Sequence, residues 1–220
     1  MDERISSRTL HFGHFKAACK KEKVISLHYQ LAEIPFQSGY SPKRWKNATN
    51  VMILKKEGLY DVDRLRTIVL YEADFNHNNK YLGKSMMEHT MRSNLLVKEQ
   101  YSIPGKKAIG HVINRRLIFD ITCYQKTSLA LTACDLKSCY NRIANIPAYL
   151  AMTSYGYKPT PIFSMFTCIQ DMKWTTRTIF GDSTKVFGGF HPSYTAKPQG
   201  VGQGNGSGPL VWTTVSSKMF

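Results

Sequence analysis

Glycine occupies every second position from Gly200 to Gly208, and an apolar stretch through Trp212 follows directly. The spacing fits neither GxGxxG nor GxxxxGK[ST], which excludes the dinucleotide and Walker types of phosphate loop. A flexible Gly/Ser linker is the simplest alternative, but a linker has no need of Val201 or Gln203. We interpret the run as a place where a ligand or a nucleic-acid strand approaches the backbone closely, because glycine leaves the amides open to donate.

The spacing of apolar residues predicts a mixed fold. Helical spacing predicts helices over 14–34, 80–97, 106–124, 148–155, 162–173 and from Pro209 onward, the first stopped by Pro35 and the last capped by Ser207. Short apolar runs predict strands over 51–54, 65–70, 129–134 and 174–180, the first two joined as a hairpin with a basic tip and the last followed by a turn at 181–183. Helices and strands that do not alternate regularly indicate the α+β class.

The charge is strongly positive and unevenly distributed. Thirty Lys or Arg residues against 15 Asp or Glu give a net charge of +15, and only four acidic residues follow position 111. Such a surface concentrates polyanions, so nucleic acid is the first partner to consider. An anionic membrane surface is the second, but the chain has no long basic amphipathic helix and no apolar run long enough to span a bilayer.

Two features of the sequence predict the compartment. The N-terminal residues lack the apolar core of a secretory signal. Five cysteines, an odd number without a CxxC pair, are typical of a reducing environment. We therefore expect an intracellular protein, nuclear or cytoplasmic, that does not enter membranes.

Asp135 is the first candidate for chemistry, because it follows the apolar run 129–134 in a half of the chain that is poor in carboxylates. A buried carboxylate is costly unless a cation meets it. The cation is either a Lys or Arg, in a structural ion pair, or a divalent metal. A second candidate is the basic hairpin with Lys55 and Arg66, which suits a triphosphate, although a solvated basic turn is the more common outcome.

Several segments, taken in order, resemble a reverse transcriptase of a eukaryotic non-LTR-like retroelement. The segments SSRTLHFGHFKA, SPKRWKNATNVMILKKEG, DVDRLRTIVLYEADFNHNNKYLG and KEQYSIPGKKAIGHVINRRLIFD resemble its early blocks. LTACDLKSCYNRI is similar to polymerase motif A, and KPQGVGQGNGSGPLVW to motif B. The resemblance implies a right-hand polymerase fold with a helical lead-in over 1–45, fingers over 46–128 and an incomplete palm over 129–220, without a thumb.

The resemblance also implies roles for individual residues. Asp135, helped by the Leu136 carbonyl, would bind two Mg²⁺ ions for nucleotidyl transfer. Contacts to the incoming dNTP would come from Lys55, Arg66, Tyr140, Gln203 and Gly204, with Tyr140 placed to exclude a 2′-hydroxyl. Gly200 and Gly202 would contact the nucleic acid, and the basic surface would follow the phosphates of an RNA template and a DNA primer.

One departure from the family limits this expectation. The aromatic-x-Asp-Asp hairpin of motif C is absent, since no two acidic residues are adjacent after Asp2-Glu3. We therefore expect this chain to be inactive alone and to need a C-terminal palm and thumb segment. The alternative is a non-catalytic nucleic-acid-binding remnant. A viral-type RNA-dependent RNA polymerase is the third choice, disfavoured by Tyr140 and by Gln203-Gly204.

Overall fold

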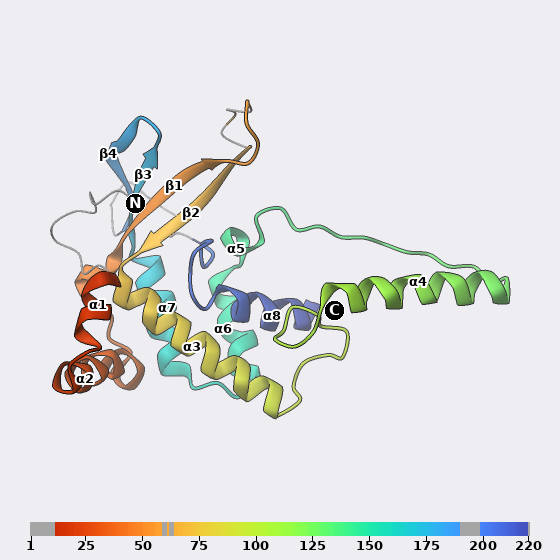
Figure 1. Ribbon diagram of the computed structural model, residues 1–220, viewed down its shortest axis with the longest axis horizontal. Coiled ribbons are helices and arrows are strands. Elements are labelled where there is room, and N and C mark those ends of the chain that lie inside the picture. Colours follow the sequence, from red (N-terminus) through yellow and green to blue (C-terminus); the bar gives the residue numbers. More distant parts are fainter. Residues whose placement is uncertain (1–11, 59–60, 62–63, 190–198, 220) are drawn as a thin grey trace.

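The computed structural model describes residues 12–58, 61, 64–189 and 199–219 of the chain (Figure 1). The beginning of the expected lead-in, residues 1–11, and the first two residues of the segment similar to motif B, 197–198, lie outside the described residues. Helices and a single mixed sheet make up the described part, which confirms the α+β class.

The sheet has four strands in the order β2-β1-β3-β4, namely β1 (Asn47–Leu54), β2 (Leu65–Tyr71), β3 (Lys173–Thr178) and β4 (Gly181–Gly188). The predicted hairpin is confirmed, because β1 and β2 pair antiparallel. β1 also pairs parallel with β3, and β3 pairs antiparallel with β4. The sheet therefore joins the segments expected as fingers and palm.

The N-terminal region differs from the predicted single helix. It forms two helices, α1 (Phe12–Ala18) and α2 (Glu22–Ser38), followed by a short 3₁₀ helix, η1 (Lys43–Lys46). Pro35 does not end α2 but is buried within it. The helix ends at Gly39, whose φ of 74° is left-handed and whose N–H donates to the Pro35 carbonyl at 3.0 Å. Glycine adopts this C-terminal conformation without steric cost.

The remaining helices are α3 (Ala73–Arg92), α4 (Ala108–Gln125), α5 (Cys139–Arg142), α6 (Asn145–Ser154), α7 (Pro159–Gln170) and α8 (Gly208–Met219). The predicted helices over 106–124, 148–155 and 162–173 are confirmed, as is the C-terminal one. Ser207 stands directly before α8, where its carbonyl accepts the Val211 N–H at 3.0 Å while its hydroxyl donates to Asn205 Oδ1 at 2.9 Å. α3 begins seven residues before the predicted helix.

One apolar core connects the sheet to α3, α6, α7 and α8. Its fully buried side chains include Phe75, Met152, Ile162, Met165 and Val211. α3 and α8 approach closely at Gly83, where a Cβ would lie 2.9 Å from the Ser207 Cα. In the described part of the chain, no helix is both long and apolar enough to cross a bilayer.

The strand predicted over 129–134 is wrong. This segment is extended but unpaired and exposed, and it returns alongside α4 outside the main body (Figure 1). No described residue of α4 is buried either. A β-compatible sequence becomes a strand only when another strand satisfies its backbone groups, and none of the described segments pairs with it.

Candidate functional site

The glycine segment 200–208 forms a loop, which we call the glycine loop, and hydrogen bonds join it to β2 and α3. The Tyr71 hydroxyl donates to the Val201 carbonyl at 2.6 Å, and the Val69 N–H donates to the Gln203 carbonyl at 2.7 Å. From α3, the Asn76 amide donates to the Gly204 carbonyl and accepts from the Gly206 N–H, at 3.1 and 2.7 Å. Backbone groups of the loop are thus satisfied by the protein.

Packing within the protein explains why this loop needs glycine. A Cβ at Gly204 would lie 2.3 Å from the Val69 carbonyl oxygen, and one at Gly202 would lie 2.3 Å from the Tyr71 hydroxyl oxygen. Both glycines also have positive φ, 124° and 70°. The close approach that the sequence suggested for a ligand is therefore made by β2.

Tyr140 lies on the one-turn helix α5, beside this loop. Its carbonyl accepts the Val201 N–H at 2.9 Å, and its ring lies against Gly208, where a Cβ would be 3.5 Å away. Burial, with a smaller contribution from Cys139, raises the pKa of the Tyr140 phenol, so the ring is neutral at physiological pH. Ser138, just before the helix, has a φ of 55°, a conformation that non-glycine residues adopt rarely and often at functional sites.

A hollow of about 280 Å³ brings most of the predicted nucleotide-binding residues together. It is lined by Lys55, Leu65, Arg66, Thr67, Leu136, Ser138, Cys139, Tyr140, Asn141 and Gln203. We call it the cationic hollow. Of the residues that the resemblance implies, Lys55, Arg66, Leu136, Tyr140 and Gln203 line it, whereas Gly204 does not.

The described lining of the cationic hollow carries a net positive charge. Lys55 and Arg66 are exposed, and within the described residues neither has an acidic partner. The lining contains no Asp or Glu. An anion can therefore enter without displacing a carboxylate, and the guanidinium of Arg66 can bind phosphate through two N–H groups.

A second hollow of about 550 Å³ adjoins the first and shares Thr67 and Asn141 with it. Its other lining residues are Asn50, Val69, Trp174, Thr176, Phe187, Gly188, Gln199, Gly200 and Gly202. We call it the neutral hollow, since its lining combines amides, hydroxyls and two aromatic rings without a charged side chain. Aromatic faces with amide groups suit a nucleobase. The predicted contact residues Gly200 and Gly202 belong here.

Trp174 and Phe187 were missed by sequence reasoning. They face each other across β3 and β4 as register partners. The alternation that begins at Trp174 indicated a strand, but the turn predicted at 181–183 concealed β4. The observed turn lies at Ile179 and Phe180, two residues earlier.

Asp135 lies on the exposed segment before α5, and the buried setting expected for it is wrong. It lines neither of these two hollows, although its neighbour Leu136 lines the cationic one. Among the described residues, no three His, Cys, Asp or Glu side chains cluster as a metal site. One exposed carboxylate does not suffice to hold two Mg²⁺ ions, so the described residues do not fit the two-ion centre.

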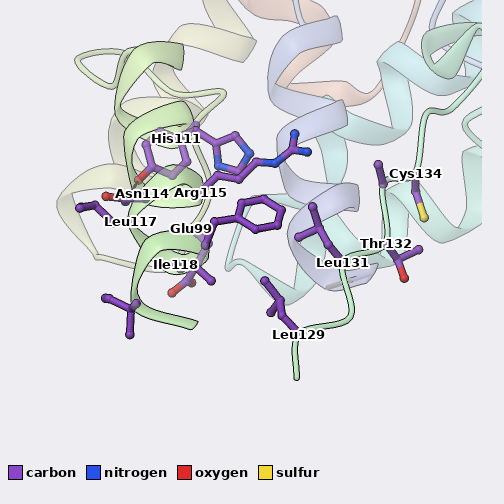
Figure 2. Close-up of a pocket in the computed structure, with 14 residues that line it drawn as sticks. Glu99, His111, Asn114, Arg115, Leu117, Ile118, Leu129, Leu131, Thr132 and Cys134 are labelled. Atoms are coloured by element: carbon purple, nitrogen blue, oxygen red, sulfur yellow. Dashed lines mark hydrogen bonds between the residues drawn. The ribbon is translucent and has the colours of Figure 1, made fainter. Parts of the chain in front are cut away.

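A further cavity of about 890 Å³ lies elsewhere, between α4 and the extended segment before Asp135. Figure 2 shows His111, Asn114, Arg115 and Ile118 on α4 facing Leu129 and Leu131. Its lining is mainly apolar and includes none of the predicted site residues.

No protein-family model matches the chain, and no curated protein is significantly similar to it in sequence.

Proposed function

We propose that this chain is the fingers and partial palm of an RNA-directed DNA polymerase of the retroelement type. The observation that carries the proposal is the cationic hollow. Its predicted nucleotide-binding residues come from β1–β2, the segment at α5 and the glycine loop, which are far apart in sequence. Four of the five residues assigned to the nucleotide, namely Lys55, Arg66, Tyr140 and Gln203, line this one hollow.

The chemistry of the lining suits a deoxynucleoside triphosphate. Lys55 and Arg66 would bind the phosphates, one as a point charge and one as a fork. The ring of Tyr140 would lie against the sugar and leave no space for a 2′-hydroxyl. The exposed side chain of Gln203 would lie beside the nucleotide.

The neutral hollow supplies a second subsite, which would receive the template. Trp174 and Phe187 offer aromatic surfaces on which bases stack, and such contacts tolerate any sequence. Gly200 and Gly202 would let the strand pass close to the loop. The net charge of +15 would hold the phosphates of an RNA template and a DNA primer.

Catalysis needs more than this chain provides. In a complete enzyme, Mg²⁺ would supply charge stabilisation for nucleotidyl transfer. Asp135 and the Leu136 carbonyl would provide some of the oxygen ligands of the metal ions. Further carboxylates would have to come from another segment. We therefore expect this chain to bind a primed template but not to extend it. Extension by the purified chain, lost in Asp135→Ala, would contradict this expectation.

The second candidate is a non-catalytic nucleic-acid-binding protein. The exposed and unpartnered position of Asp135 favours it, because no described carboxylate joins Asp135 in a metal site. Such a protein would bind RNA through its basic surface, and would not discriminate among nucleotides.

Binding measurements on the whole chain separate the two. Fluorescence anisotropy would follow a labelled RNA template with a DNA primer, with dNTP or NTP added together with Mg²⁺. The polymerase proposal expects dNTP to tighten the complex, and Arg66→Ala to abolish the tightening. Lys56→Ala is the matched control, since this exposed neighbour of Lys55 carries the same charge but does not line the hollow.

Three other results would decide against this proposal. Salt-sensitive binding that ignores dNTP would support the second candidate, with affinity falling at least about tenfold between roughly 50 and 200 mM salt. A preference for NTP would support the RNA-dependent RNA polymerase. Absence of binding to any nucleic acid would overturn all three functions.

A further inference from the structure

The β3–β4 hairpin ends in two large apolar residues that are almost fully exposed. Thr178 and Gly181 are register partners, which leaves Ile179 and Phe180 as the two residues of the turn. Their exposed fractions are 79% and 92%, and Phe180 is the most exposed large apolar side chain in the described part of the chain. Two-residue hairpin turns favour Asn, Asp and Gly. Exposed apolar side chains at these positions do not stabilise the fold, which indicates that they bind a partner.

An ion pair joins the two strands next to the turn. Just behind it, Arg177 binds Asp182 through two parallel contacts, Nε to Oδ1 at 2.5 Å and Nη2 to Oδ2 at 2.8 Å. Gly181 takes the positive φ that the turn requires, 116°, so that neither apolar residue has to. The ion pair and the φ of Gly181 both favour one backbone conformation of the turn, which lowers the entropy lost on binding.

The same two strands line the neutral hollow. Thr176 of β3 is part of its lining, and Ile179 is three residues further along the chain. At a rise of about 3.3 Å per residue, the turn lies roughly 10 Å beyond the hollow, which is the length of about three stacked nucleotides. The hairpin stands away from the helices, so a strand leaving the hollow can reach it (Figure 1).

The charge of the β3–β4 hairpin indicates which class of partner it can bind. Residues 173–188 contain Lys173, Arg177 and Lys185 against Asp182, which is a net charge of 3 − 1 = +2. The whole chain carries +15, so a second copy would be repelled electrostatically. A polyanion is attracted, and the adjoining amide and aromatic lining favours nucleic acid.

We propose that Ile179 and Phe180 form a stacking wedge for an unpaired nucleotide of the template. The Phe180 ring would stack on a base where the single strand meets the duplex, and Ile179 would cover the edge of that base. The wedge would thereby set the path of the template into the neutral hollow. This inference rests on the proposed function.

The test uses the full chain and an RNA template with a recessed DNA primer. A fluorescent adenine analogue is placed singly at successive positions of the unpaired template, and its quenching reports stacking. We expect wild-type protein to quench the analogue at one or two adjacent positions. Phe180→Ala should remove this quenching and weaken binding about tenfold, whereas Phe180→Trp should retain both.

Tyr124→Ala is the matched control. Tyr124 is 89% exposed, also aromatic, and lies at the end of α4, which points away from the sheet (Figure 1). Its removal should leave the quenching and the affinity unchanged. Circular dichroism of each variant should match the wild type, because neither side chain is packed.

The possible outcomes separate this inference from the proposed function. If wild-type protein binds the primed template and Phe180→Ala behaves identically, the wedge is overturned while the polymerase proposal stands. If wild-type protein binds no primed template, both fail together. If Phe180→Ala instead lowers only the binding to vesicles of phosphatidylserine and phosphatidylcholine, the turn is a membrane contact and the wedge is again overturned.

Discussion

The backbone N–H of Val69 donates a 2.7 Å hydrogen bond to the carbonyl of Gln203. β2 is an edge strand of the sheet, so this contact makes the glycine loop a short extension of it. The backbone of Gln203 is thereby held while its side chain stays exposed at the cationic hollow. The loop is part of the folded body, and its position sets the relation between the two hollows.

Replacing Gly204 with Ala should displace this loop. The new Cβ would meet the Val69 carbonyl oxygen, and the φ of 124° is unfavourable for alanine. We expect the free energy of unfolding to fall by about 2–3 kcal/mol, the upper end for a strained backbone, with dNTP binding lost as well. Urea denaturation would measure it. Gly105→Ala is the control, since its φ of 87° is also positive but its Cβ would enter open space. Equal losses in both variants would show that the clash with Val69 is unimportant.

Substitution of Asp74 should destabilise the protein more than substitution of Asp135. Asp74 is buried, pairs with Arg44 and accepts a hydrogen bond from the Phe75 N–H at 3.1 Å. Asp74→Ala should cost about 1–2 kcal/mol, because the buried Phe75 N–H loses its acceptor, whereas half-exposed Arg44 can be solvated. Asp135→Ala should change the stability by less than about 0.5 kcal/mol, because Asp135 is exposed. Thermal and urea unfolding would show the difference. A large loss in Asp135→Ala would mean that this carboxylate has a structural partner.

Cys168 should make the protein less stable in alkali. Burial raises the pKa of its thiol to about 12, well above the ordinary value of 9.0. The unfolded chain therefore loses this proton first, so stability is complete below about pH 9 and falls as the pH rises toward 12. From about pH 8 to pH 10 the loss should reach up to about 1.4 kcal/mol for this group.

Urea denaturation at the two pH values would test this, with Cys168→Ala expected to reduce the pH dependence. Cys19→Ala is the control, because Cys19 is an exposed thiol, and its variant should keep the full dependence. Buried Tyr71 and Tyr157 also have raised pKa values and act in the same direction, so a remainder should persist. Stability that rises with pH in this range would contradict the burial of Cys168.

Local pattern was enough to predict the hairpin of β1 and β2, since both strands and their turn are adjacent in sequence. It was not enough for the strand expected before Asp135, because apolar β-compatible residues also occur in an unpaired segment. The start of α3 was missed for a similar reason. Its first turns contain polar residues such as Asn78, which is buried and donates to the Ala32 carbonyl at 2.9 Å. Polar residues that are satisfied by distant groups have no sequence signal.

The linings of the two hollows also differed in how far the sequence could predict them. Tyr140 and Gln203 were predicted because the order of motifs resembles a polymerase, and Lys55 and Arg66 were indicated by the basic hairpin as well. The aromatic lining of the neutral hollow depends on the pairing of β3 with both β1 and β4. Parallel pairing of β1 with β3 brings together segments from opposite halves of the chain, and such long-range contacts leave no local pattern.

Tyr140 should decide which sugar the cationic hollow accepts. If its ring excludes a 2′-hydroxyl, wild-type protein should bind dNTP more tightly than NTP, and Tyr140→Ala should bring the two affinities together. Tyr140→Phe should keep the discrimination, because it keeps the ring and loses only a hydroxyl. Competition between dATP and ATP for the labelled primed complex would measure the ratio. Because Tyr140 is partly buried beside Gly208, the Ala variant must first be shown to fold. A folded Tyr140→Ala protein with the wild-type ratio would mean that the ring packs the loop but does not select the sugar.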